Sequence, residues 1–191
     1  MEIVDQLNAF PEVKFFLNNG FQASIECKKV PVIDSHDLEW AFNLTKQNMQ
    51  SMYITSEWGW DDKEKKEEMF DKKGWYLIAR NDQNIPIGMV SFRFDIEEGD
   101  AVVYCYEIQL SQSIRGKGLG KYLMNILKLL GTRSKMDKVM LTVFKHNERA
   151  YHFFTNVVGF QIDEISPSRC DPDNDDNYCY EILSINLTDA K

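Results

Sequence analysis

The hydrophobic positions of this chain change their period at Gly74, from helical spacing before it to alternation after it. Upstream, four apolar residues at helical spacing predict a helix over 37–53, whose first turn Asp34 or Ser35 can cap. These four are Leu38, Phe42, Met49 and Tyr53. A charged helical stretch follows at 63–72. Further upstream we expect a first strand over 21–27 and a loosely helical segment over 2–18, which lies in an N-terminal segment of residues 1–20 that docks on the domain.

Downstream of Gly74, alternation over 75–80, 86–94 and 101–110 predicts three strands, and the turn residues between them indicate an antiparallel meander. An apolar helix over 121–131 is expected to end at Gly131. The remaining predicted elements are a buried strand, a helix and two further strands, over 139–144, 147–158, 159–165 and 178–187. This order predicts an α/β fold with one mixed central sheet and helices on both of its faces.

Length and composition are typical of a globular protein with one domain, spanning residues 1–191. Free cysteines are expected, because the four cysteines show neither CxxC nor zinc-ligand spacing; a disulfide between Cys170 and Cys179 is the alternative. The chain has no membrane-length apolar run and no signal-peptide pattern, which predicts a soluble intracellular protein. A net charge of −8 disfavours nucleic-acid binding and weakly favours a basic partner.

The most informative stretch is QLSQSIRGKGLGK (109–121), which joins a predicted strand to a predicted helix. Its glycines let backbone N–H groups turn toward an anion, and the helix start adds partial positive charge, so the turn can bind a diphosphate. A Walker A loop is excluded because Tyr122 stands where Ser or Thr is required. A dinucleotide fingerprint is excluded because Lys121 or Leu123 stands at its third glycine.

The pattern Arg-x-x-Gly-x-Gly does fit this turn, and it resembles the acetyl-CoA diphosphate motif of the GNAT superfamily of acetyltransferases. The stretch NERAYHFFTNVVGF resembles a second segment of that superfamily, in which Asn147 and Tyr151 approach the pantetheine arm and the departing thiol. The resemblance implies acetyl-CoA as co-substrate, no metal, and Tyr151 as an acid for the leaving thiolate. It also assigns to cofactor binding the residues Ile108, Gln109, Leu110, Arg115, Gly116, Lys117, Gly118, Leu119, Gly120 and Lys121.

Further stretches of the sequence resemble one particular family within this superfamily. EWGW, YCYE and FKHN, together with WAFNLTKQNMQSMY, WYLIA, FRFD and YEILS, are similar to the NatD family of N-terminal acetyltransferases, over roughly residues 35–184. That family acetylates the N-terminal serine of histones H4 and 2A, whose tails begin Ser-Gly-Arg-Gly. The resemblance implies the GNAT fold, with a sheet that splays open where acetyl-CoA enters.

Glu107 is the candidate general base, because it lies a few residues before the diphosphate turn. An α-amine has an ordinary pKa of about 7.7–8.0, so the base has only to take its proton, directly or through a water. Strand alternation places Tyr104 and Tyr106, both assigned to substrate binding, on the face opposite Glu107. A structural hydrogen-bonding role for Glu107 is therefore the alternative. Backbone N–H groups near 108–110 are expected to hold the thioester oxygen.

Asp95 and Glu97 lie two residues apart, so they share one face of an extended strand. Neighbouring carboxylates are stabilised by a shared cation, and the arginine at the third position of the substrate would supply one. A solvated turn is the alternative. Tyr53, Trp58 and Tyr180 are candidates for the walls of a narrow peptide mouth, because aromatic side chains supply rigid contact area.

The sequence thus predicts direct acetyl transfer from acetyl-CoA to the N-terminal α-amine of histone H4 and 2A tails. We expect a monomer of the cytoplasm and nucleus that contacts neither nucleic acid nor membrane. Two alternatives stay open. The acceptor is instead a lysine side chain, a polyamine or another small amine, or the domain binds acyl-CoA and peptide without turnover.

Overall fold

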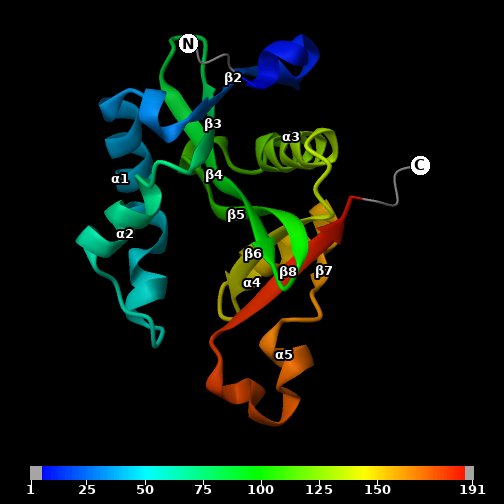
Figure 1. Ribbon diagram of the computed structural model, residues 1–191. Helices are drawn as coiled ribbons and strands as arrows, with labels where there is room; N and C mark the ends of the chain where they lie inside the picture. Colours follow the sequence, from blue (N-terminus) through cyan, green and yellow to red (C-terminus); the bar gives the residue numbers. More distant parts are fainter. Residues whose placement is uncertain (1–5, 188–191) are drawn as a thin grey trace. The chain divides into compact units, whose positions relative to one another are not determined.

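The protein's structure is a computed structural model that describes residues 6–187, and Figure 1 shows its helices and strands, most of them labelled. Its strands form an open eight-stranded sheet in the order β1-β2-β3-β4-β5-β6-β8-β7. They are β1 (Phe15–Asn18), β2 (Phe21–Lys29), β3 (Trp75–Arg80), β4 (Pro86–Glu97), β5 (Asp100–Leu110), β6 (Lys138–Phe144), β7 (Gln161–Ile162) and β8 (Tyr180–Asn186). β5 and β6 run parallel, whereas the pairs β1–β2, β2–β3, β3–β4, β6–β8 and β7–β8 are antiparallel. The predicted mixed sheet is confirmed.

The helices follow the sequence prediction closely in the middle of the chain. They are α1 (Ser35–Ile54), α2 (Asp62–Met69), α3 (Leu119–Arg133), α4 (Glu148–His152) and α5 (Pro167–Cys170). A π-helix, η5 (Phe153–Val158), continues α4, and short 3-10 helices are η1 (Gln6–Ala9), η2 (Pro11–Lys14), η3 (Val30–Val32), η4 (Gln112–Ile114) and η6 (Pro172–Asn177). Asp34 accepts the backbone N–H of His36 at 2.8 Å, which confirms one of the two predicted caps of α1.

Two sequence predictions need correction. Gly131 does not end its helix but lies two residues before the end of α3. Close packing explains this glycine, because a Cβ there would lie 2.5 Å from Leu187 Cδ1 and 3.1 Å from Val103 Cγ2. The N-terminal segment is not loosely helical to residue 18. Residues 2–5 lie outside the described part, and after η1 and η2 the chain forms strand β1.

The missed strand belongs to a tight hairpin. Asn18 pairs with Phe21 across Asn19 and Gly20, whose φ angles are 47° and 77°. A two-residue turn with both central residues at positive φ matches the right-handed twist of the strands, and Asn-Gly is its preferred sequence. The hairpin β1–β2 therefore follows from local turn chemistry.

The described chain divides into two compact units, and the first comprises residues 6–50, 60–93 and 107–126. Its apolar core lies between α1, α2 and one face of β3 and β4, with Phe42, Met69, Tyr76 and Met89 almost fully buried. Within this unit helices cover both faces of the sheet. A Cβ on Gly88, the residue before Met89, would lie 3.6 Å from Leu119 of α3, on the opposite side from the α1–α2 core.

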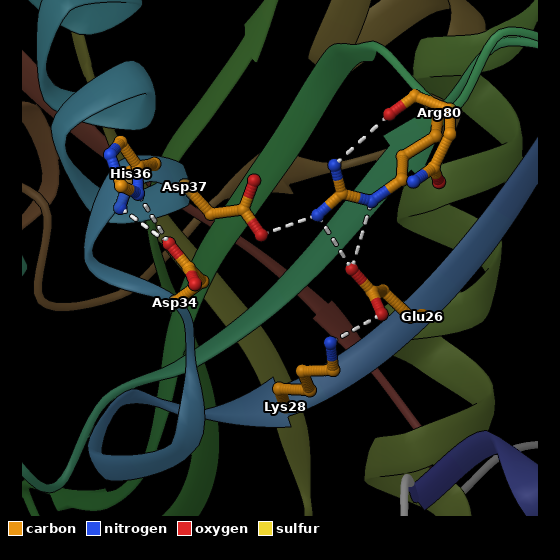
Figure 2. A network of polar contacts seen from close by, with 7 residues as sticks. Glu26, Lys28, Asp34, His36, Asp37 and Arg80 are labelled. Atoms are coloured by element: carbon orange, nitrogen blue, oxygen red, sulfur yellow. Dashed lines mark hydrogen bonds and ion pairs between the residues drawn. The ribbon is translucent and has the colours of Figure 1, made fainter.

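A polar cluster in the first unit ties the start of α1 to β2 and β3 (Figure 2). The guanidinium of Arg80 donates to Glu26 at 2.9 Å and 3.1 Å and forms a further ion pair with Asp37 in the first turn of α1. Lys28 pairs with the other oxygen of Glu26 at 2.6 Å. Because the Arg80 side chain is only 14% exposed, these carboxylates replace the water it gives up on folding.

The second unit comprises residues 51–59, 94–106 and 127–187. β6 lies at its centre, paired in parallel with β5 over Val102–Cys105 and antiparallel with β8 along its whole length. The ladder with β5 ends at the pair Cys105 and Leu141, although β6 continues to Phe144. The parallel ladder therefore covers only the first part of β6.

Candidate functional site

The turn 115–120 of the first unit has the geometry of an anion site. Gly116 and Gly118 have φ angles of 76° and 87°, a region in which side chains are strained, so both positions require glycine. Gly116, Lys117 and Gly118 are exposed, and their N–H groups have no acceptor among the described residues. α3 starts directly after them and adds the partial positive charge of its N-terminus. The turn can therefore bind a diphosphate.

The other residues predicted to bind the cofactor take three kinds of position. Leu119 and Gly120 are buried in the first turn of α3, whereas Lys121 is exposed. Arg115 donates from Nε to the carbonyl oxygen of Leu110 at 3.2 Å, which links the turn to the end of β5. Lys117 places its ammonium 4.8 Å from the centre of the Phe21 ring, a cation–π contact with the hairpin.

The side chains of β5 alternate as predicted. Cys105, Glu107 and Gln109 are buried on one face, whereas Tyr104 and Tyr106 are half-buried on the other, with ring centres 5.1 Å apart. Glu107 thus points away from the two tyrosines. Ile108 and Leu110 lie on the tyrosine face by the same alternation and are half-buried.

Glu107 is held in a buried polar network. Lys65 of α2 places its ammonium 2.7 Å from Glu107 Oε1, and the two side chains are only 7% and 5% exposed. The amide of Gln109 donates to Glu107 Oε2 at 2.8 Å, and Asn48 of α1 donates to Gln109 at 2.9 Å. Each carboxylate oxygen therefore has a protein partner. A second Asn48 contact, 3.3 Å to the carbonyl oxygen of Leu110, fixes the end of β5.

In the second unit, three residues predicted to wall the peptide mouth come together. Trp58 lies with its ring centre 5.1 Å from Tyr180 and 6.1 Å from Tyr53. Phe144, at the end of β6, is in contact with both Trp58 and Tyr53, at 5.0 Å and 4.9 Å. Trp58 is still 46% exposed, so this aromatic group presents one large indole to solvent. We call Tyr53, Trp58, Phe144 and Tyr180 the aromatic cluster.

Acidic and phenolic groups lie on β4 and β5 of the same unit. Burial raises the pKa of Glu97, and the neighbouring charges of Asp95 and Glu98 raise it further. No cation of the described chain lies within ion-pair distance of Asp95 or Glu97. Burial raises the pKa of Tyr104 to about 12, although its hydroxyl is 2.5 Å from that of Thr142, a contact that lowers it.

Asn147 and Tyr151, predicted to approach the pantetheine arm, belong to the second unit as well. The side-chain oxygen of Asn147 accepts the N–H of Ala150 at 3.2 Å and caps α4. Tyr151 is half-buried one turn later, just before the helix widens into the π-helix η5. Lys128 donates to the carbonyl oxygen of Val158 at 3.1 Å and satisfies the last turn of that helix.

Sequence reasoning missed two residues of these groups. Lys65 lies in the charged run KEKKEEM, which predicts a solvated helix face, and nothing in the run singles out one lysine for burial. Phe144 was assigned only to a buried strand. Its place at the end of that strand, next to the string FKHN, was the available signal for a role in the aromatic cluster.

The described residues bear on several general expectations. All four cysteines are free thiols. Between residues 6 and 187 there is no group of His, Cys, Asp and Glu side chains that could hold a metal ion. None of the helices described is both long and apolar enough to cross a membrane.

Residues 36–160 match the acetyltransferase (GNAT) family, and the chain belongs to that family. Several solved structures share its fold. The PaiA N-acetyltransferase of Thermoplasma acidophilum, in complex with coenzyme A, is 16% identical, covers 85% of this chain and 99% of its own, and has a TM-score of 0.59. The spermidine N-acetyltransferase of Vibrio cholerae, in complex with CoA and spermine, is 16% identical, covers 86% of this chain and 96% of its own, and has a TM-score of 0.59. Arabidopsis thaliana NAA60, in complex with a bisubstrate analogue, is 12% identical, covers 85% of this chain and 98% of its own, and has a TM-score of 0.58.

The protein is therefore an acetyl-CoA-dependent acetyltransferase. The exposed N–H groups of the turn 115–120 fit the diphosphate of that co-substrate, because they are donors with no acceptor of their own among the described residues. Acetyl-CoA supplies an activated acyl group, and the chain has to bind it, orient the acceptor amine and handle one proton.

Proposed function

We propose that this enzyme acetylates the α-amine of an N-terminal serine in tails that begin Ser-Gly-Arg-Gly, as those of histones H4 and 2A do. The observation that carries the proposal is the aromatic cluster. Its neighbouring rings have centres 4.9–6.1 Å apart, and Trp58 is 46% exposed. Rigid walls of this kind favour a small first residue and exclude a bulky one.

The acidic pair supports a basic residue close to the N-terminus of the substrate. Burial, together with the charges of Asp95 and Glu98, raises the pKa of Glu97 and so the cost of ionising its carboxyl group. A guanidinium lowers that cost and can bind one carboxylate through two hydrogen bonds. The net charge of −8 acts in the same direction at longer range.

In the proposed reaction, the amine lone pair attacks the thioester carbonyl, and the C–N bond forms as the C–S bond breaks. Backbone N–H groups near 108–110 stabilise the developing oxyanion. Glu107 receives the amine proton through a water, since Lys65 and Gln109 already contact its two oxygens. Tyr151 supplies a proton to the departing thiolate of CoA, which leaves readily in any case.

CoA release with two peptides tests the proposal. The first is SGRGKGGK with a free α-amine, and the second is the same peptide with that amine already acetylated. Release with the first alone is the expected result. Equal release with both would make lysine side chains the acceptors, and release with neither would leave a polyamine, another small amine or a non-catalytic role.

Two substitutions test the assigned residues against a matched control. Replacing Glu97 by Gln should raise KM for the free peptide, and the increase should vanish with a peptide whose third residue is alanine. Glu98→Gln removes the same charge one residue away, in the turn, and should change KM little. Glu107→Gln should lower kcat with little change in acetyl-CoA affinity, and unchanged turnover would remove Glu107 from the mechanism.

A further inference from the structure

The hairpin β1–β2 lies against the diphosphate turn through several contacts of different kinds. Asn18, the last residue of β1, donates from its side-chain amide to the carbonyl oxygen of Lys117 at 3.0 Å. Tyr122 of α3 donates its hydroxyl to the carbonyl oxygen of Phe15 at 3.1 Å. The buried Phe16 ring lies 5.0 Å from the Tyr122 ring. All of these residues belong to the first unit.

The position of the Asn18 contact gives it a consequence for anion binding. The carbonyl of Lys117 and the N–H of Gly118 belong to one planar trans peptide, in which they point in opposite directions. A donor that holds the carbonyl therefore also fixes the direction of the N–H. That N–H is exposed and has no acceptor among the described residues.

Gly118 makes such a constraint necessary. Its φ angle is 87°, and glycine by itself does not hold that angle, because it populates positive and negative φ about equally. Among the described residues, and leaving aside those adjoining Gly118, a Cβ on Gly118 would meet Asn18 Nδ2 at 3.3 Å and Phe16 Cζ at 3.6 Å. The hairpin is thus what bounds this peptide.

We propose that Asn18 is a positioning residue for acetyl-CoA, which orients the Lys117–Gly118 peptide so that its N–H faces the diphosphate. The same hairpin draws the Lys117 ammonium onto the Phe21 ring and so sets where that charge lies. Asn18 and Phe21, on either side of the hairpin turn, then belong to the co-substrate site. The proposal rests on the acetyl-CoA turn alone and is independent of which amine accepts the acetyl group.

The test is the affinity of the full-length protein for CoA, measured by isothermal titration without any acceptor. A net hydrogen bond contributes about 1 kcal/mol, which corresponds to roughly five-fold in affinity, so Asn18→Leu should bind CoA about five-fold more weakly. Asn18→Asp keeps the size and the turn preference of the side chain but cannot donate. It should lose more at low salt, because its charge lies close to the bound anion, and part of that loss should disappear at high salt.

Leu17→Ala is the matched control, because Leu17 is the adjacent hairpin residue and is 73% exposed. Its CoA affinity should equal that of the wild type. The backbone amide resonance of Gly118 gives a second measurement, since CoA should shift it downfield in the wild type and less in Asn18→Leu.

A purely structural hairpin would lower the melting temperature of the Asn18 variants but leave their CoA affinity and the Gly118 shift unchanged. That result would overturn the proposal, as would wild-type affinity in Asn18→Asp. If the histone-tail peptides gave no CoA release but the Asn18 variants bound CoA as expected, the proposed role of Asn18 would still hold.

Discussion

Replacing Lys65 by Met is the substitution with the largest expected effect on stability. It removes the ammonium that lies 2.7 Å from Glu107 Oε1 and leaves that carboxylate 5% exposed. Methionine has a similar volume and keeps the apolar contacts of the lysine stem, so the effect isolates the charge. The second partner of Lys65, Glu68, is 38% exposed and can be solvated by water instead.

The magnitude follows from the burial of both groups. Removing one partner of a buried ion pair costs about 3–5 kcal/mol, because the remaining charge is left uncompensated. In a protein of this size that corresponds to a fall in melting temperature of roughly 6–20 °C. The double variant Lys65→Met/Glu107→Gln buries no unpaired charge, and it should regain most of the loss.

The test is a double-mutant cycle. The free energy of unfolding is measured by heat and by urea at pH 7 for the wild type, Lys65→Met, Glu107→Gln and the double variant. Lys63→Met is the control, since Lys63 is 85% exposed and its pair with Glu67 spans 3.8 Å. A surface pair of this kind contributes at most about 1 kcal/mol. The reasoning is refuted if Lys65→Met costs no more than Lys63→Met, or if the double variant is no more stable than Lys65→Met.

Three further predictions concern packing and charge. Gly131→Ala should lower stability by about 1–3 kcal/mol in urea unfolding, despite alanine's higher helix propensity, because its methyl group would lie 2.5 Å from Leu187; a stabilised variant would contradict this. Tyr104→Phe should remove a tyrosine that ionises near pH 12 from the absorbance titration of the folded protein, in which Tyr76, Tyr122 and Tyr178 also have raised pKa values; the stability that Tyr104 contributes is present below pH 10 and lost as the pH rises toward 12. Arg80→Met leaves two carboxylates without their guanidinium and should cost roughly 1.5–3 kcal/mol, whereas an effect below 0.5 kcal/mol would mean that water replaces it.

Most of the fold could be predicted because hydrophobic period and turn chemistry agree from residue 34 onward. The helix over 37–53 and the three strands after Gly74 have strong periodicity, and all four were confirmed. The exceptions have local causes. At Gly131, tertiary packing accounts for a glycine that sequence rules place at a helix end. At Asn19-Gly20 the hairpin signal was present but was overlooked beside the apolar residues of 2–18.

The candidate site was predictable to a different degree for each type of residue. The diphosphate turn follows from glycine spacing, because backbone conformation is a local property. The aromatic cluster joins α1, β6 and β8, and Tyr53, Trp58 and Tyr180 were predicted to lie together from their aromatic character, whereas Phe144 was not. The Lys65–Glu107 pair could not be predicted, because its two residues are 42 positions apart and a lysine in a charged helix is ordinarily solvated.

The order of the strands has a consequence for how the protein behaves at high concentration. The two strands at the edges of the sheet, β1 and β7, contain only four and two residues. Unpaired strand edges are templates on which other chains can add, and short edges offer few hydrogen bonds to a newcomer. They cover their long neighbours only in part, because β1 pairs with β2 over Phe21–Ser24 and β7 pairs with β8 at Leu183 and Ser184. Edge-to-edge growth would therefore have to begin on β2 beyond Ser24 or on β8 outside Leu183 and Ser184, and the two short strands reduce the length of edge that is open to it.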